Sequence, residues 1–192
     1  MSLASGDTPS IVDVQNDFLP SGALAVSDEE AVIEPLNRCI TTIDRCGLPI
    51  FGTSDWHPAN HCWLHRPGGP WPPHCVAGTK GAEFSQRPQR PKTVRVVSKA
   101  ARSQAEAYSA FEGTDLARQL RQAGSRRLFI GGLATECCAR ATALDARAPG
   151  FEVVVLEDAV QDVEVHPGDG ERAFADMAAH DVQLTSVAQA LA

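Results

Sequence analysis

Long apolar segments and clusters of positive charge are both missing from this sequence. Its apolar runs fall far short of the roughly 18–20 residues needed to span a bilayer. Its 17 Lys and Arg are outnumbered by 24 Asp and Glu, for a net charge of -7, and they form no run. This balance argues against a surface that binds nucleic acid or an anionic membrane. Residues 1–7 also lack the basic and apolar regions of a signal peptide, so we expect a cytoplasmic protein.

A disulfide framework is missing as well. The six cysteines are scattered along 192 residues and two of them are adjacent, a spacing that suits reduced thiols. With 43% hydrophobic residues the chain can bury an ordinary core without disulfides, and its length predicts a single domain over residues 1–192. Tyr occurs once and only three of the 17 cations are Lys, so each of these rare residues is informative.

Short β-branched runs alternate with helical patterns along the chain. Strands are expected at 11–14, 48–51, 93–99, 127–130, 151–156 and 182–186. Helices are expected at 36–46, at 114–123, from the glycine pair 131–132 to about residue 148, and at 170–180. This order predicts an α/β fold with three layers, α-β-α, around a central parallel sheet of about six strands.

Reactive side chains follow four of the predicted strands. They are Asp13, Asp55 with His57, Lys99, and the turn at 135–138. In parallel sheets ligands bind outside the carboxyl ends of the strands. The sequence therefore predicts that carboxylates, an imidazole, an amine and a thiol meet at one edge of the sheet.

The turn after the glycine pair predicts a nucleophile. Thr135 can cap the following helix, which would place Cys138 in its first turn. Free N–H groups and the helix dipole there would lower the pKa of a thiol and could hold an oxyanion. The alternative is that Cys137 and Cys138 are small buried hydrophobic residues. The pattern alone does not say which of the two faces a cleft.

Asp13 and Lys99 are candidates for the groups that would serve such a thiol. Apolar neighbours would bury Asp13, and a buried aspartate must be paired or must act as a base. Lys99 is its natural partner, in a chain that otherwise prefers Arg. The alternative is a structural Asp–Lys pair.

A metal site is predicted around the long loop at 58–81, which is rich in Pro, Gly and Trp. Asp55 and His57 are two residues apart and a distant His74 would complete a three-ligand site with open positions for water or substrate. His61 and His65 lie in the same loop. The alternatives are surface histidines without a metal, or a structural zinc site that also uses Cys62 and Cys75.

Several motifs, in order and over nearly the whole chain, carry a family resemblance. They are IVDVQNDF (11–18), SDWHPANH (54–61), GPWPPHCVAGTKGAEF (69–84), VSKA (97–100), AYSAFEGTDL (107–116) and GLATECCARATALDA (132–146). The chain resembles the nicotinamidases (pyrazinamidases) of the isochorismatase-like cysteine hydrolases. The DWH motif together with WPxHC is the discriminating part, because relatives acting on other small amides generally lack that metal loop.

The resemblance implies a catalytic triad of Asp13, Lys99 and Cys138. The family nucleophile is the last residue of its A-T-x-x-C turn, which selects Cys138 over Cys137. The family also has a cis peptide bond before the alanine of this turn, here Ala134. The backbone N–H groups of Ala134 and Cys138 would form the oxyanion hole.

The resemblance also implies one divalent metal ion held by Asp55, His57 and His74. Zinc is the first choice, and iron or manganese would suit the same ligands. His61 has a less certain counterpart, because family members differ in whether a fourth side chain reaches the metal.

The implied reaction is hydrolysis of nicotinamide to nicotinate and ammonia through a cysteine thioester, with pyrazinamide also accepted, as a step of NAD salvage and pyridine nucleotide biosynthesis. Phe18, Trp71 and Tyr108 would wall the substrate ring, and Ala134 would contact the substrate. One alternative is another small carboxamide or ureido hydrolase of the same fold. A remote alternative is a non-enzymatic zinc or thiol protein. No nucleic-acid or membrane partner is expected, and a homo-oligomer is compatible with the sequence.

Two positions depart from the family pattern. Residues 6–10 are polar and turn-like where the first strand usually has apolar residues, which leaves the length of that strand open. Cys137 stands where an aromatic residue or His is more common, and it could alter the pocket or be sensitive to oxidation.

Overall fold

A sheet of six parallel strands forms the centre of the computed structural model, which describes residues 3–64 and 71–192. The strand order is β3-β2-β1-β4-β5-β6, and every neighbouring pair is parallel. The strands are β1 (Asp7–Val12), β2 (Phe51–Asp55), β3 (Arg95–Lys99), β4 (Arg127–Leu133), β5 (Glu152–Gln161) and β6 (Gln183–Thr185). The predicted parallel sheet is confirmed.

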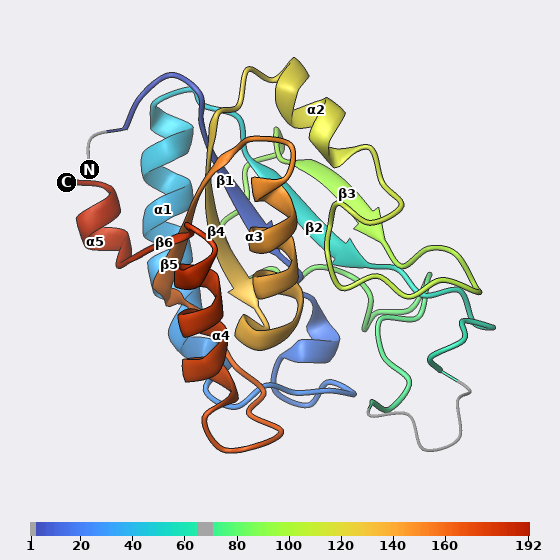
Figure 1. Cartoon of the computed structure of the whole chain (residues 1–192). Helices are drawn as coiled ribbons and strands as arrows, with labels where there is room; N and C mark the ends of the chain where they lie inside the picture. Colours follow the sequence, from blue (N-terminus) through green and yellow to red (C-terminus); the bar gives the residue numbers. More distant parts are fainter. Residues whose placement is uncertain (1–2, 65–70) are drawn as a thin grey trace.

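Helices cover both faces of this sheet (Figure 1). Helices α1 (Ile33–Arg45) and α5 (Val187–Ala190) pack on one face, with the short turns η1 (Asn16–Phe18) and η2 (Glu29–Val32) nearby in the chain. The other face carries α2 (Leu116–Gln122), the π-helical turn η3 (Thr135–Ala139), α3 (Arg140–Arg147) and α4 (Asp169–Ala179). The three predicted layers, α-β-α, are therefore present.

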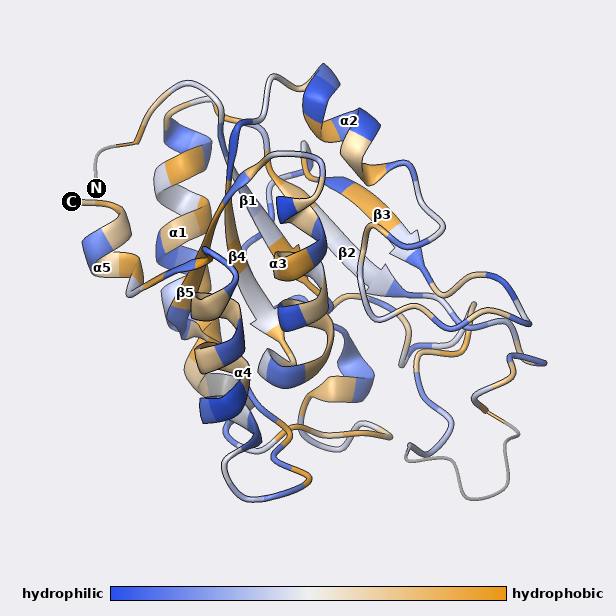
Figure 2. Ribbon diagram, viewed as in Figure 1, coloured by the Kyte–Doolittle hydropathy of each residue, from blue (hydrophilic) through white to orange (hydrophobic). Residues whose placement is uncertain are grey.

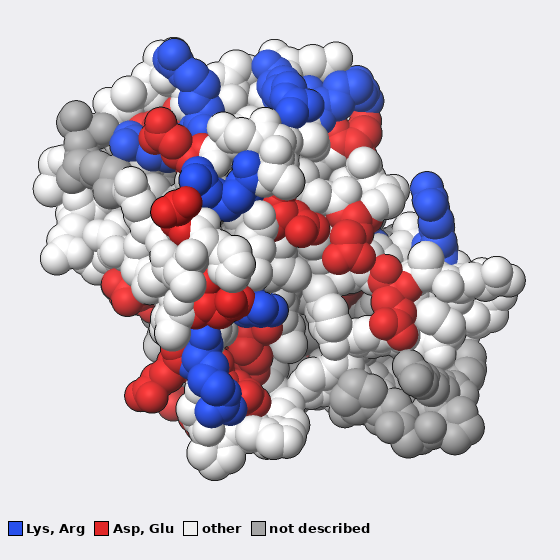
Figure 3. Space-filling model, viewed as in Figure 1, with Lys and Arg blue, Asp and Glu red and all other residues white. Residues whose placement is uncertain are grey.

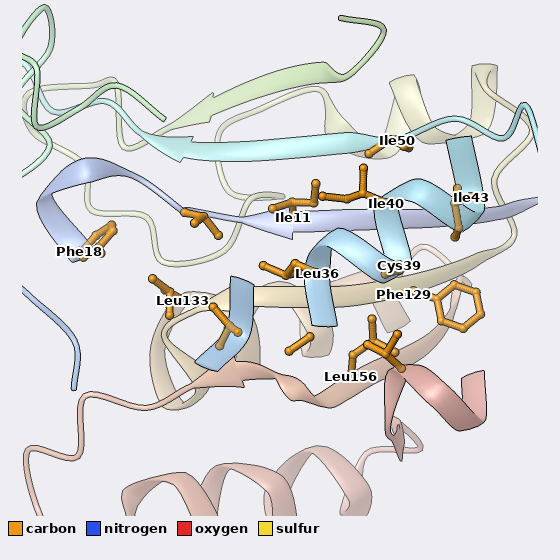
Figure 4. Close-up of a cluster of buried hydrophobic side chains, with 14 of the residues drawn as sticks. Ile11, Phe18, Leu36, Cys39, Ile40, Ile43, Ile50, Phe129, Leu133 and Leu156 are labelled. Atoms are coloured by element: carbon orange, nitrogen blue, oxygen red, sulfur yellow. The ribbon is translucent and has the colours of Figure 1, made fainter. Parts of the chain in front are cut away.

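The core on the α1 face shows how one helix is held on the sheet. Leu36, Ile40 and Ile43 recur on a single stripe of α1 and are almost completely buried. They belong to the same cluster as Ile11 of β1 and Phe129 of β4 (Figure 4). This apolar contact fixes α1 across the two central strands.

Strand β1 is longer at its start than the sequence indicates. It runs from Asp7 to Val12 instead of 11–14, and all six residues are buried. Two of its polar side chains are paired: Arg127 donates to both carboxylate oxygens of Asp7 at 2.9 and 2.7 Å, and the hydroxyls of Thr8 and Ser125 lie 2.7 Å apart. Among the described residues the buried Ser10 hydroxyl has no hydrogen-bond partner. Such pairs remove the cost of burying polar groups, which a hydropathy pattern cannot anticipate. Figure 2 accordingly shows β1 and β2 paler than the hydrophobic β5.

Three other strand boundaries were predicted wrongly, among them the end of the fifth strand, which was expected at 156 but lies at Gln161. The second strand was expected at 48–51, but β2 spans Phe51–Asp55, whose polar residues are all buried. The fourth was expected to end before the glycine pair, but β4 continues to Leu133. A Cβ atom on Gly132 would lie 2.0 Å from the carbonyl oxygen of Val12, so this glycine allows β4 to stay paired with β1.

The helix boundaries differ less from the prediction. Helix α2 begins at Leu116, and its N-cap is Asp115 instead of the expected Thr114. The Thr114 hydroxyl still accepts the Leu116 N–H at 3.2 Å, while it donates to the Ala110 carbonyl. The short α5 was not predicted, and a capping box of Ser186 and Gln189 starts it.

The surface agrees with the charge balance of the sequence. On the face shown in Figure 3, Lys and Arg side chains are interspersed with Asp and Glu. Among the described residues no helix is both long and apolar enough to cross a bilayer. His65 and the adjoining part of the predicted metal loop lie outside the described residues.

Candidate active site

The four predicted reactive segments meet at the carboxyl edge of the sheet, toward which the arrowheads in Figure 1 point. Asp13 follows β1 directly, and its φ of 50° turns the chain out of the strand. Asp55 and Lys99 are the last residues of β2 and β3 and are register partners. Cys138 lies in η3, which follows β4 after one residue. Four adjacent strands thus deliver the predicted groups to one place.

The Lys99 ammonium is the centre of this arrangement. Its Nζ lies 3.0 Å from Asp13 Oδ2, 2.5 Å from Asp55 Oδ1 and 3.2 Å from Cys138 Sγ, and it donates to the Ala107 carbonyl at 3.3 Å. The side chain is buried, and burial by itself would lower its pKa. Its anionic neighbours Asp13 and Asp55 outweigh this effect and raise the pKa well above the ordinary value. Lys99 therefore stays charged.

Asp13 is completely buried. Burial raises the pKa of its carboxyl group, although Lys99 opposes the shift. Its Oδ1 accepts the Thr53 hydroxyl at 2.7 Å, while Oδ2 has Lys99 as its one partner in the described part of the chain. One oxygen of Asp13 and the Cys138 sulfur lie within 4.8 Å of each other. Asp13 is thus a carboxylate of raised basicity, close enough to the thiol to exchange a proton through a small movement.

Burial determines the pKa of the Cys138 thiol more strongly than the nearby helix start does. The residue is 6% exposed, and burial raises its pKa well above the ordinary value even though Lys99 acts in the opposite direction. The expectation of a lowered pKa is therefore wrong for the protein without substrate. A thiol in such an environment becomes a nucleophile only when a neighbouring base takes its proton.

The turn before Cys138 has the shape expected of an anion-binding turn, but not the predicted cap. The Leu133–Ala134 peptide bond is cis, as the resemblance implies. The N-cap position is occupied by Ala134, without a side-chain cap, so the expectation for Thr135 is wrong. The Ala134 carbonyl instead accepts the N–H groups of Cys137 and Ala139, at 3.2 and 3.1 Å. Among the described residues no acceptor is found for the Ala134 N–H, which remains available to a ligand.

A second cluster joins Asp55, His57 and His74, which are all buried and whose ligand atoms lie within 4.8 Å of one another. His57 Nδ1 lies 2.9 Å from the His74 carbonyl, and His74 Nδ1 lies 2.8 Å from the Pro72 carbonyl. Both rings therefore carry the proton on Nδ1, which leaves each Nε2 lone pair for a metal. Burial lowers the pKa of His57 and favours the neutral, metal-binding form. These residues fit a divalent ion of the zinc type.

Other candidate ligands are not in this cluster. His61 is buried, but its Nε2 lies 3.1 Å from the Ala105 carbonyl and its Nδ1 accepts the Trp63 N–H at 3.3 Å, so both nitrogens are engaged. Cys62 is exposed, and among the described residues neither it nor Cys75 joins a donor cluster. The structural zinc alternative therefore finds no support.

A further group of donors also lies within 4.8 Å, namely Asp13, Asp55 and Cys138. The Lys99 ammonium already occupies the space among them, at 2.5–3.2 Å from each. A metal ion there would meet a fixed positive charge. Of the two clusters, only the one with the histidines is suited to a cation.

One pocket is lined by Cys138 and by all three residues of the histidine cluster, and all the predicted ring-contacting residues line it as well. They are Phe18, Trp71, Tyr108 and Ala134. The Trp71 indole N–H donates to the Tyr108 hydroxyl at 3.2 Å, which fixes these two walls to each other. The sequence did not indicate four further apolar wall residues, since nothing in their spacing distinguishes them from core: Leu24, Trp63, Ala107 and Val163. Cys137 also lines the pocket, beside the nucleophile.

A family model described as the isochorismatase domain matches residues 11–189. The chain belongs to the isochorismatase family. The match includes every residue named above as part of the site.

Curated and solved relatives point to one branch of the isochorismatase family. The nicotinamidase of Escherichia coli strain K12 is 32% identical over 199 residues, covering 93% of each chain. The pyrazinamidase of Pyrococcus horikoshii, solved in complex with zinc, is 45% identical with a TM-score of 0.89, over 94% of this chain and 99% of that one. PnC1 from L. infantum, solved in complex with nicotinate, is 35% identical with a TM-score of 0.87, over 100% and 98%.

Two polar residues, Gln15 and Glu136, support the site in this isochorismatase-family chain. Neither carries a sequence signal of its own. Gln15 is completely buried and bonds to the backbone of Asp55. The carboxylate of Glu136 accepts the N–H groups of Val163 and Glu164, each at 3.0 Å, and so holds one pocket wall. The alternation of polar residues after Asp13 is the one pattern that could have indicated the first of them.

Proposed function

We propose that the protein is a nicotinamidase, which hydrolyses nicotinamide to nicotinate and ammonia and also accepts pyrazinamide. The observation that carries this proposal is the contact of one ammonium, Lys99, with both a buried carboxylate and a thiol. The thiol residue Cys138 lines an aromatic pocket that Asp55, His57 and His74 line as well. The nicotinamidase and pyrazinamidase relatives support the same choice of substrate.

The first step of the proposed mechanism is a proton transfer from Cys138 to Asp13. It moves one negative charge between two groups that both contact Lys99, so the total charge around the ammonium is unchanged. Burial raises the pKa of the Asp13 carboxyl group, which makes its carboxylate a stronger base for this transfer. The Cys138 thiolate then attacks the carboxamide carbon of the substrate.

The negative charge that develops on the carboxamide oxygen is held by the backbone N–H groups of Ala134 and Cys138. Asp13 returns its proton to the nitrogen, the C–N bond breaks, and ammonia leaves a thioester on Cys138. A water molecule then gives a proton to Asp13 and attacks the thioester. The C–S bond breaks, Asp13 passes its proton to the leaving Cys138 sulfur and so restores the thiol, and the acid product loses a proton to solvent and leaves as nicotinate.

The pocket orients the ring for this attack. Phe18, Trp71 and Tyr108 wall it, and burial raises the pKa of Tyr108 to about 12, so its hydroxyl remains neutral. A divalent ion held by Asp55, His57 and His74, zinc in the first place, would bind the pyridine nitrogen directly or through water and withdraw electron density from the ring. Orientation by ring walls and by the ring nitrogen distinguishes nicotinamide from aliphatic amides.

The test is ammonia release from nicotinamide by the wild-type protein and by Cys138→Ala, with zinc supplied. We expect turnover by the wild type and none by the variant.

A wild type that releases ammonia from aliphatic amides or ureido compounds but not from nicotinamide would support the alternative function, another small carboxamide or ureido hydrolase of the family. We further propose that the enzyme acts in the cytoplasm, in NAD salvage.

A further inference from the structure

The segment after β1 carries polar side chains at positions 13, 15 and 17. Asp13 reaches the reaction centre, whereas the next two residues bond to backbone beside the metal cluster. We propose that Gln15 and Asp17 are positioning residues for the metal ligands, Gln15 for Asp55 and Asp17 for both histidines. The proposal rests on the metal site of the proposed function.

Gln15 clamps the backbone of Asp55. Its amide nitrogen donates to the Asp55 carbonyl, its amide oxygen accepts the Asp55 N–H, and both bonds measure 2.8 Å. The same nitrogen also donates to the Ala82 carbonyl at 2.8 Å, so the side chain is held from the opposite side. Because Gln15 is completely buried, water cannot replace these bonds. The clamp fixes the backbone from which the metal-binding carboxylate projects.

Asp17 acts through a single peptide group, the one that joins His74 to Cys75. The N–H of this group donates to Asp17 Oδ2 at 2.7 Å, and its carbonyl lies 2.9 Å from His57 Nδ1. The carboxylate therefore holds the peptide that sets the ring orientation of His57, and the same peptide begins at His74. Partners of this kind fix the tautomer and orientation of metal-binding histidines.

The Asp17 carboxylate lies in a tightly enclosed space. A Cβ atom on Gly81 would lie 2.2 Å from Asp17 Oδ2, so only glycine allows this approach. The Ala23 N–H donates to Oδ1 at 3.2 Å, and the Asp17 N–H donates to the Gly81 carbonyl at 3.0 Å. The carboxylate is thus held against the loop that carries His74.

The chain offers a matched control between the two residues. Asn16 also bonds to backbone of the same loop, since its side-chain nitrogen donates to the Lys80 carbonyl at 2.8 Å. This bond is exposed and involves no residue of the metal cluster. A substitution of Asn16 therefore removes a side-chain bond to the loop without removing support for the metal ligands.

The experiment measures zinc affinity of the metal-free protein by competition with a chromophoric chelator. We expect Gln15→Met, which keeps the side-chain volume, and Asp17→Ala to weaken zinc binding by about 10- to 100-fold. Asn16→Ala should bind as the wild type does, and Asp17→Asn should recover part of the affinity because its amide oxygen can still accept the Cys75 N–H. The absorption spectrum of the cobalt-loaded protein should change for Gln15→Met and Asp17→Ala alone, which a general loss of stability would not produce.

Melting of the metal-free variants identifies any that fail to fold. If Asp17→Ala fails, Gly81→Ala carries the test, because its added methyl group must displace the carboxylate and weaken zinc binding. Zinc affinities equal to that of the wild type in Gln15→Met and in the Asp17 variants would overturn the proposal, as would a wild type that binds no zinc. A wild type that binds zinc but does not hydrolyse nicotinamide would refute the proposed function alone, and the order of zinc affinities would still decide this proposal.

Discussion

The two halves of the active site are built in different ways. Asp13, Lys99 and Cys138 lie at or just beyond the ends of regular elements, so the register of the sheet determines their spacing. His57 and His74 lie outside the helices and strands, and their positions depend on individual hydrogen bonds, such as the His57 N–H to the Cys75 carbonyl at 3.0 Å. The reacting half is therefore a property of the fold, whereas the metal-binding half, apart from Asp55 at the end of β2, is a property of one loop and its supports.

The largest effect should follow a change in the reacting half. Asp13→Asn keeps the shape of the side chain and can keep the Thr53 bond, but it removes the base. We expect kcat to fall by about 100- to 10,000-fold, the usual contribution of a general base. Steady-state ammonia release with nicotinamide measures this change. Near-normal turnover would mean that Asp13 is not the base that takes the proton from Cys138.

A change in the metal-binding half should be smaller and of another kind. His57→Ala removes a ligand while the groups around Lys99 remain. We therefore expect the variant to lose zinc and its KM for nicotinamide to rise by about tenfold or more. A tenfold rise corresponds to about 1.4 kcal/mol of binding free energy. His61→Ala is the matched control, because both ring nitrogens of His61 are engaged with backbone. Zinc content by atomic absorption, with KM and kcat for both variants, makes the comparison. Equal loss of zinc in both would show that His61 changes its partners and binds the ion.

The same division explains how far the sequence alone could go. The strand-end rule places Asp13, Lys99 and Cys138 together because it depends only on the order of strands and helices. It does not predict β1 from Asp7, because that strand is polar and is stabilised by Arg127, 120 residues away in the chain. In the loop, the motif resemblance supplies the ligands, but their supports arise from contacts over long sequence separations that no local pattern encodes.

Substitutions of Glu136 test whether the two halves of the active site depend on each other. Its carboxylate joins the turn of the nucleophile to the backbone at Val163, which lines the pocket. We expect Glu136→Ala to raise KM by about tenfold, or ~1.4 kcal/mol, with a smaller change in kcat, because the wall moves while the reacting groups stay in place. Glu136→Gln keeps an acceptor for these N–H groups and should restore KM. A fall in kcat with constant KM would mean that Glu136 supports the nucleophile instead of the wall.

The smallest effect should come from the residue next to the nucleophile. Cys137 lines the pocket, yet burial raises the pKa of its thiol to about 12, and Lys99 opposes this shift only in part. Among the described residues the hydrogen bond of Lys99 to sulfur goes to Cys138. It therefore lacks the base and the ammonium that serve Cys138. Cys137→Ala should leave kcat for nicotinamide close to that of the wild type and alter KM slightly, through the shape of the pocket wall.

A thiol reagent that carries a pyridine carboxamide should label Cys138 in both the wild type and the Cys137→Ala variant, in titrations with and without nicotinamide. If Cys137→Ala instead abolishes labelling and turnover, the assignment of the nucleophile within the turn is wrong and the contact between Lys99 and the Cys138 sulfur serves only to bury the thiol.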